Sequence, residues 1–262
     1  MDIDLTLDTA ISVAQSAGKL LLSYSKRSVK IESKGQGNFV SEADKASEKF
    51  IIEKLLAKFP CSSVLAEEGG SIEGNTPLKW IIDPLDGTTN FLHGYPHYAV
   101  SIAASWNDIL FAGVVYHPSL DETFSAGLGR GAFLNGQKIS VSSNRRIPES
   151  LLVTGFSYDT GDKLRRSMKM FQAFQDNGQT LRRTGSAALD LAYVAAGRFD
   201  GFWETGLFPW DCSAGILMIQ EAGGMVSDYA NNPYILGGPD ILTSNGLLHQ
   251  EMLRRLQPFS SS

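Results

Sequence analysis

The sequence predicts an α+β fold in which helices cover the faces of β-sheets. Three features of its 262 residues support this class. Two helical segments open the chain, strand-like segments run from Val64 to Ser125, and strands then alternate with helices in the second half. Such a succession is typical of proteins in which sheets and helices pack as layers.

The first sixty residues contain two expected helices. Apolar residues recur at helical spacing over residues 3 to 24 and predict a long amphipathic helix. We expect a polar loop at residues 32 to 40, followed by a second helix from about 41 to 58 that stops before Pro60. Both helices are expected on one face of a sheet.

Strand-like segments separated by turn residues occupy the middle of the chain. They are S-V-L-A, W-I-I, Y-A-V-S-I-A-A-S-W, F-A-G-V-V-Y and E-T-F-S-A. Closely spaced glycines in G-L-G-R-G-A-F-L-N-G-Q-K then predict a hairpin.

The second half is expected to alternate between strands and helices. Its expected strands are L-L-V-T-G-F, 180–183, 199–203, 225–228 and 240–243, and its expected helices are 162–176, 186–196, 210–222 and 246–256. No linker rich in Pro, Gly and Ser separates the halves, so we expect a single domain over 1–262 with two lobes, about 1–145 and 146–262. The tail Q-P-F-S-S-S is expected to fray.

Composition excludes several classes of protein. The net charge of −5 gives no basic footprint of a general nucleic-acid binder. Cys61 and Cys212 stand alone and far apart, which favours a reducing compartment over a disulfide framework. The N-terminus is acidic, and no apolar run approaches the ~20 residues of a membrane span. We therefore expect a cytoplasmic protein without a membrane partner.

The segment W-I-I-D-P-L-D-G-T-T-N-F, residues 80–91, carries the strongest chemical signal. Asp83 and Asp86 would lie close together in a tight turn and repel each other unless a positive charge lies between them. Mg²⁺ takes oxygen ligands, and these two side chains with the Leu85 carbonyl offer three in four residues. The backbone N–H groups of Gly87 and Thr88, at an expected helix start, could hold a phosphate. Together they suit metal-assisted phosphoryl chemistry.

Further carboxylates occur at expected strand ends and helix starts, where sheet proteins build sites. They are Asp44, Glu67, Glu204 and Asp211. Asp44 and Asp211 each have a structural alternative, because acids in the first helical turn cap free N–H groups and interact favourably with the helix dipole. Ser41-Glu-Ala-Asp44 is itself a capping box, and Glu68 fits a solvated residue.

Four linked motifs in order resemble those of the inositol monophosphatase family of Mg²⁺-dependent, lithium-sensitive phosphatases. They are A-E-E-G, W-I-I-D-P-L-D-G-T-T-N-F, W-E-T-G-L-F-P-W-D-C-S-A-G and E-A-G-G, and the resemblance covers nearly the whole chain. It implies a layered αβαβα sandwich, a homodimer, and hydrolysis of small phosphomonoesters by direct attack of a metal-activated water.

The resemblance also implies roles for individual residues. Glu67, Asp83 and the Leu85 carbonyl resemble the ligands of one metal ion, and Asp83, Asp86 and Asp211 those of a second. A third, weaker ion would use Glu67, so two or three Mg²⁺ ions are implied. Asp44, Glu67 and Thr88 take catalytic roles, in which Asp44 and Thr88 orient the nucleophilic water.

Substrate binding is implied for a set of residues around the same motifs. The set is Asp86, Gly87, Thr88, Gly185, Ser186, Ala187, Glu204 and Asp211. Lys34 resembles a lysine near the metal site. Two departures concern the substrate: Phe208 stands where animal inositol phosphatases have a histidine, and residues 156–159 do not match their substrate-contacting serine.

Several functions therefore stay open. Inositol-1-monophosphatase is the first, with a small phosphorylated polyol as substrate. Enzymes that share D-P-x-D-G-T are the alternatives: fructose-1,6-bisphosphatase, histidinol-phosphate phosphatase, NADP(H) phosphatase and 3′-nucleotide bisphosphate phosphatase. T-T-N-F at 88–91 favours the inositol branch. A regulatory protein that binds transcription machinery is the non-enzymatic alternative.

Overall fold

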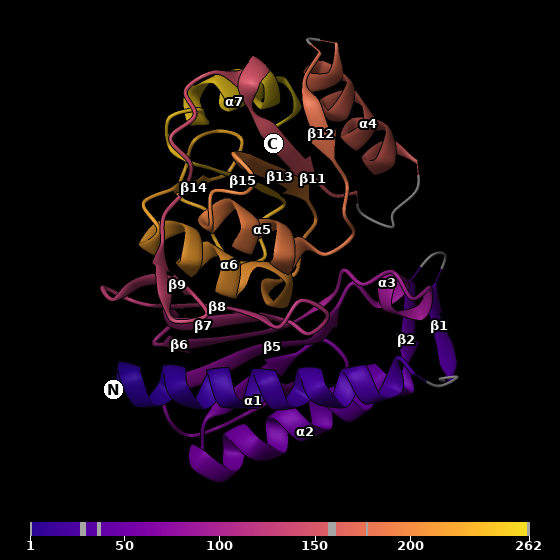
Figure 1. Ribbon diagram of the computed structural model, residues 1–262, viewed down its shortest axis with the longest axis vertical. Coiled ribbons are helices and arrows are strands. Elements are labelled where there is room, and N and C mark those ends of the chain that lie inside the picture. The colour runs from indigo at the N-terminus through magenta and orange to yellow at the C-terminus, as the bar shows by residue number, and fades with distance from the viewer. Residues whose placement is uncertain (1, 27–29, 36–37, 157–160, 177, 261–262) are drawn as a thin grey trace.

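The elements of the protein stack in five layers in the order helix, sheet, helix, sheet, helix, as a computed structural model shows (Figure 1). The structure describes residues 2–26, 30–35, 38–156, 161–176 and 178–260. The layered αβαβα expectation is confirmed. Among the described residues, no helix combines the length and the apolar character that crossing a membrane requires.

The larger sheet has the strand order β10-β9-β8-β7-β6-β5-β3-β4. Its strands are β3 (Ser63–Ala66), β4 (Gly70–Ile72), β5 (Leu78–Asp86), β6 (Ala99–Trp106), β7 (Ile109–His117), β8 (Glu122–Gly127), β9 (Gly131–Leu134) and β10 (Gln137–Ile139). β3 and β5 run parallel, and the other described pairs in this sheet are antiparallel. β9 and β10 form the expected hairpin.

Helices α1 (Ile3–Tyr24) and α2 (Glu42–Lys58) cover one face of this sheet, as expected (Figure 1). Alternate residues of a strand face opposite sides of a sheet. In β5, Trp80 and Ile82 therefore pack with Leu21 and Ile51 of these helices, whereas Ile81 belongs to the core on the opposite face.

The smaller sheet has the strand order β12-β11-β13-β15-β14. Its strands are β11 (Leu151–Thr154), β12 (Thr180–Arg182), β13 (Gly201–Thr205), β14 (Met225–Ser227) and β15 (Asp240–Ser244). Helices α5 (Ala187–Ala195) and α6 (Pro209–Glu221) lie between the two sheets, and α4 (Asp162–Gln175) and α7 (His249–Leu256) cover the outer face (Figure 1). In β13, Phe202 packs in the inner core and Trp203 in the outer one.

Residues 32–40 do not form the expected loop. The structure has a hairpin of β1 (Ile31–Gly35) and β2 (Asn38–Ser41), in which Ile31 pairs with Ser41. The apolar alternation needed to recognise two strands is too short here, because Phe39 and Val40 are the only apolar residues of β2. The loop expectation was wrong.

Four other elements also differ from expectation. Strand β4 and the 3₁₀ turn η1 (Ile147–Glu149) were not predicted. A second 3₁₀ turn, η2 (Gln257–Phe259), lies in the tail expected to fray, because Phe259 packs on the outer core. Helix α7 begins at His249 rather than 246, because the Asn245 side chain accepts hydrogen bonds from the N–H groups of Leu247 and Leu248.

Strand β5 continues through the two aspartates instead of ending before them. Asp83 pairs with Ser101 and Asp86 with Ala99, so the register shifts between them. A bulge of this kind accommodates Pro84, which has no N–H to donate. The two aspartates thus lie on a bent strand end rather than in a tight turn.

Gly113 of β7 lets α6 pack closely on the larger sheet. A Cβ atom at Gly113 would lie 3.0 Å from the Ala214 Cα and 3.1 Å from the Ala214 carbonyl oxygen. Both are backbone atoms of a helix, so they cannot rotate away. The start of α6 therefore depends on this glycine for its position over the sheet.

We predict that Gly113→Ala lowers the free energy of unfolding by about 1–3 kcal/mol, because the added methyl overpacks the contact between β7 and α6. Urea titration checks this. Gly127→Ala is the matched control on the neighbouring strand, because its Cβ would meet only the side chains of Arg130 and Ile3. Equal stability losses in the two variants would contradict the prediction.

Candidate active site

Glu67 and Asp83 lie side by side because the strands that carry them are parallel neighbours. Ala66 of β3 pairs with Ile82 of β5, and each acid is the next residue along its strand. The Glu67 N–H donates to the Ile82 carbonyl at 3.3 Å, which extends the pairing to the site. Carboxyl ends of parallel strands meet at the same edge of a sheet. The structure thus brings two predicted metal ligands together.

Asp86 joins the larger sheet to the start of α5. One of its carboxylate oxygens accepts hydrogen bonds from the Ser186 hydroxyl at 2.6 Å and the Ala188 N–H at 2.7 Å. Ser186 is the N-cap of α5 and also accepts a hydrogen bond from the Leu189 N–H. The predicted loop Gly185–Ala187 is therefore held against the predicted metal ligand Asp86.

Asp211 enters the site from the first turn of α6. The Phe208 N–H donates to its carboxylate at 2.7 Å, which caps the helix. Ser101, the cross-strand partner of Asp83, donates to the Trp210 carbonyl at 3.4 Å. This contact sets the helix start beside the end of β5.

The carboxylates of this site repel one another. Burial raises the pKa of Asp83 well above its usual range, and the charges of Glu67, Asp86 and Asp211 raise it further. Burial and then the Asp86 charge likewise raise the pKa of Asp211 well above its usual range. Burial raises the pKa of Asp86 to about 6, even though its hydrogen bonds act in the opposite direction. Like charges in a poorly hydrated place have this effect.

Asp44 and Thr88 are hydrogen-bonded to each other. Asp44 is buried in the first turn of α2, where one carboxylate oxygen accepts from the Ser41 N–H at 2.8 Å and hydroxyl at 2.6 Å. Its other oxygen accepts from the Thr88 hydroxyl at 2.8 Å. The Leu85 carbonyl also lies 3.1 Å from that hydroxyl. The capping box and the predicted pairing with Thr88 therefore coexist.

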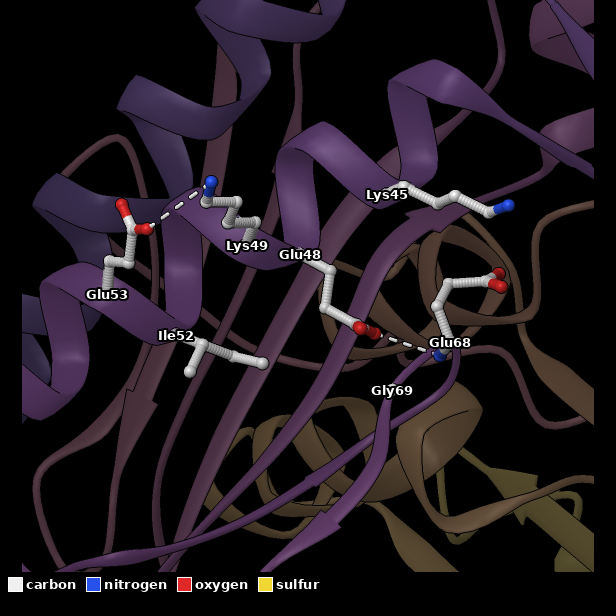
Figure 2. A pocket seen from close by; sticks show the side chains of 7 residues that line it. All are labelled: Lys45, Glu48, Lys49, Ile52, Glu53, Glu68 and Gly69. Carbon is white, nitrogen blue, oxygen red and sulfur yellow. Dashed lines mark hydrogen bonds and ion pairs between the residues drawn. The ribbon is translucent and has the colours of Figure 1, made fainter.

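The turn that carries Glu67 is anchored to α2 by Glu48 (Figure 2). The Glu68 N–H donates to the Glu48 carboxylate at 2.8 Å, and the Glu48 side chain is largely buried. A Cβ atom at Gly69 would lie 2.8 Å from a Glu48 carboxylate oxygen, so the turn approaches this group closely. Since α2 also carries Asp44, this helix positions two of the predicted catalytic residues.

A small pocket of about 120 Å³ adjoins the carboxylates on the side of the smaller sheet. Its lining combines predicted and unpredicted residues: Asp86, Gly155, Phe156, Arg183, Gly185, Ser186, Ala187, Asp190, Glu204, Leu207 and Asp211. Burial raises the pKa of Glu204 to about 8, and the charges of Asp190 and Asp86 contribute. Glu204 is therefore protonated near neutral pH and can donate a hydrogen bond.

Five of the residues that line the pocket were not predicted as site residues: Gly155, Phe156, Arg183, Asp190 and Leu207. Asp190 is buried and accepts a hydrogen bond from the Thr184 hydroxyl at 2.6 Å. Its position one helical turn after Ser186 was the available signal. Gly155 has no local signal, yet its Cβ would lie 2.1 Å from the Glu204 carboxylate. Arg183 lies two residues before the predicted loop Gly185–Ala187.

Two predictions from the sequence fall on residues or side chains that the structure does not describe. Ser157 to Asp159 of the predicted mismatch lie outside the described residues, as does the Lys34 side chain. The N–H of Gly87 donates to the Asp86 carboxylate. Helix α3 (Thr88–Leu92), which starts there, has five residues, and phosphate binding at its start stays a prediction.

The donor set at this site fits a hard divalent cation. It consists of carboxylates and one backbone carbonyl, the oxygen ligands that Mg²⁺ takes. In the part of the chain that the structure describes, no three acidic, histidine or cysteine side chains already form a metal-binding cluster. Three of the four carboxylates accept hydrogen bonds from protein N–H groups instead. A cation would relieve the repulsion that raises the pKa of Asp83.

Comparison with known proteins gives the family. The sequence model described as the Inositol monophosphatase family matches residues 2–261. The chain is 42% identical to the Nus factor SuhB of Pseudomonas aeruginosa, covering 96% of each chain. It is 43% identical to the inositol-1-monophosphatase of Synechocystis, covering 97% of this chain and 90% of the other.

Solved structures agree with this result. The extragenic suppressor protein suhB from Bartonella henselae has a TM-score of 0.92 and 38% identity, covering 97% of this chain and 98% of the other. The inositol monophosphatase from Anabaena has a TM-score of 0.88 and 40% identity, covering 98% and 97%. The chain thus belongs to the inositol monophosphatase family and is a phosphoric monoester hydrolase.

Proposed function

We propose that this enzyme is a Mg²⁺-dependent phosphatase of small polyol monophosphates, with inositol 1-phosphate as the favoured substrate. The observation that carries the proposal is the convergence of four mutually repelling carboxylates beside a pocket lined by hydrogen-bonding groups. Relatives named inositol-1-monophosphatase support the choice of substrate.

In this proposal two ligand sets share one residue. Glu67, Asp83 and the Leu85 carbonyl would hold one Mg²⁺ ion, and Asp83, Asp86 and Asp211 a second; a third would use Glu67. When bound, Mg²⁺ would polarise the phosphoryl group, neutralise its charge and lower the pKa of a coordinated water.

The residues of the chain then orient the nucleophile and the substrate. The Thr88 hydroxyl donates its hydrogen to Asp44, so its oxygen is free to accept a hydrogen bond from the attacking water. Asp44 holds Thr88 in that orientation, because its second oxygen is fixed by Ser41. The water would thus be aligned by two groups from different helices.

The pocket favours a hydroxyl-rich monophosphate. Its volume of about 120 Å³ suits a small ring better than a nucleotide. Asp86, Asp190 and Asp211 can accept hydrogen bonds from hydroxyl groups, and protonated Glu204 can donate one. A second phosphate placed among these acids would be repelled. This argues against fructose 1,6-bisphosphate, NADP and 3′-nucleotide bisphosphates as preferred substrates.

A second candidate function is binding to transcription machinery. Relatives 40–43% identical over nearly the whole chain carry the name Nus factor SuhB. This role would not require catalysis. If an inactive variant such as Asp83→Asn still binds transcription complexes, that result would support this second function. Loss of the binding in the same variant would contradict it.

The homodimer and the single two-lobed domain are retained as proposals from the sequence. Light scattering of the purified chain tests the first. One cooperative unfolding transition, observed with both a fluorescence and a circular dichroism probe, would support the second.

We predict phosphate release from inositol 1-phosphate with Mg²⁺ present and none above background with EDTA. Fructose 1,6-bisphosphate, NADP and 3′-phosphoadenosine 5′-phosphate should give lower kcat/KM, because the acidic lining disfavours their additional phosphate groups. Histidinol phosphate should also give a lower value, because it lacks the ring of hydroxyl groups from which the carboxylates would accept hydrogen bonds. Comparing kcat/KM across this panel checks the substrate. Failure to hydrolyse any small phosphomonoester would overturn the enzymatic proposal.

We predict that Asp83→Asn lowers kcat by at least about 10²-fold without destabilising the fold. The amide cannot replace a carboxylate shared by two cations, yet it removes a buried charge that three neighbours repel. Kinetics with Mg²⁺ and urea unfolding in EDTA check the two parts. Asp108→Asn, at an exposed surface pair with Lys79, is the control and should retain activity. Activity near wild type in Asp83→Asn would exclude the shared ligand.

We predict that Glu204→Gln reduces the loss of stability that wild type shows between about pH 5 and pH 8, to which neighbouring acids with raised pKa values also contribute. The folded-state pKa of Glu204 is about 8 against an ordinary value of 4.5, so the folded protein binds the extra proton and loses stability as pH rises through this range. Between these pH values, Glu204 lowers the free energy of unfolding of the wild type by at most about 5 kcal/mol relative to Glu204→Gln. Urea titrations in EDTA at several pH values measure it, with exposed Glu53→Gln as control. Parallel wild-type and Glu204→Gln profiles would refute the assignment.

A further inference from the structure

Asn90 connects three segments of the chain at the site. It lies in α3, directly after the strand end that carries Asp83 and Asp86. Its side-chain nitrogen donates to the His97 carbonyl at 2.7 Å and to the Thr184 carbonyl at 3.0 Å. Both partners are backbone acceptors, so only the nitrogen end of the amide can face them. Residues 94 positions apart are thereby joined.

The loop after Thr184 is packed directly on this side chain. Gly185 has φ +89, and its Cβ would lie 3.1 Å from the Asn90 nitrogen and 3.2 Å from the Asn90 oxygen. On the other side of the contact, Gly87 has φ +91, and its Cβ would lie 3.0 Å from the His97 carbonyl and 3.3 Å from the Gly185 carbonyl. The two segments approach each other through glycines at a distance that a side chain would prevent.

A second link between the same segments runs through Asp86, which accepts from Ser186 and Ala188. Asp86 is a proposed metal ligand, so its charge and hydrogen bonding would change when a cation binds. The Asn90 side chain is neutral and lies outside the proposed ligand sets. Its two hydrogen bonds can therefore persist in both states of the site.

We propose that Asn90 is a positioning residue, which holds the substrate loop Gly185–Ala187 in register with the metal-ligand segment Asp83–Asp86. The proposal rests on the proposed function, in which this loop contacts the polyol while the strand end holds the metal ions. Asn90 itself belongs to neither the proposed metal ligands nor the proposed substrate-binding residues. Its loss should therefore weaken substrate binding more than metal binding or turnover.

Two substitutions separate hydrogen bonding from packing. Asn90→Ala removes the amide, whereas Asn90→Asp keeps its size but places a carboxylate against two carbonyl oxygens. We expect KM for inositol 1-phosphate to rise about tenfold in both, with kcat within about threefold of wild type and the Mg²⁺ concentration for half-maximal activity nearly unchanged. Asn232→Ala is the matched control, because exposed Asn232 also donates through its side-chain amide, to Asp228, and this variant should keep wild-type kinetics.

A merely structural role gives a different result. It would reduce the active fraction and hence kcat, and leave KM unchanged. Unchanged KM in Asn90→Ala, or wild-type KM in Asn90→Asp, would overturn the proposal.

A double-mutant cycle with Gly185→Ala tests the contact itself. Alone, Gly185→Ala adds both an unfavourable positive φ and a methyl crowded against Asn90. In the Asn90→Ala background the crowding is removed and the backbone cost remains. We expect Gly185→Ala to raise KM less in that background than in wild type. Strictly additive effects would contradict a direct contact.

Hydrogen exchange of the metal-free protein provides a readout independent of activity. We expect amides of residues 185–189 to exchange faster in Asn90→Ala than in wild type, and those of β13 to be unaffected. Unchanged hydrogen exchange of the amides of residues 185–189 in Asn90→Ala would refute the proposed link between Asn90 and the substrate loop. Absence of phosphatase activity in wild type would instead refute the proposed function, and the exchange measurement would still decide the role of Asn90.

Discussion

The repulsion between closely placed carboxylates is the constraint on which the site depends. Buried Asp83 lies among the half-buried Glu67, Asp86 and Asp211, where reduced access of water weakens the screening of their charges. A flexible chain would separate these groups. Here each acid is fixed by the end of a strand or the first turn of a helix, so the fold holds the charges together in advance of any ligand.

The two sheets contribute different residues to the site. The larger sheet presents the acids proposed as metal ligands at the ends of β3 and β5, and the smaller sheet presents Glu204 on β13. Helices α5 and α6 lie between the sheets (Figure 1), and their first turns carry Ala187 and Asp211, which line the pocket together with Asp86 and Glu204. Small residues such as Gly113 and Gly155 permit these close approaches. The layered architecture is therefore what brings metal ligands and substrate pocket together.

The sequence was sufficient for the helices, the sheet-rich centre and the acidic motif, because periodicity and linked local motifs encode them. It did not reveal the β1–β2 hairpin or the continuation of β5 through Pro84, since short strands and bulges depend on tertiary pairing. Asp190 and Gly155 were missed for a related reason. Gly155 matters through its close approach to Glu204, which is distant in the chain, and Asp190 through its burial and its hydrogen bond to Thr184, which no short motif marks.

Asp44 divides its two oxygens between two tasks. One oxygen caps α2 through Ser41, and the other holds Thr88. The same carboxylate therefore caps the helix and orients the Thr88 hydroxyl, the group proposed to align the nucleophile. Loss of the Asp44 carboxylate would therefore lower the stability of the fold and the activity together. A chain that evolved toward binding alone could relax the metal ligands freely, but it would retain this aspartate for its helix.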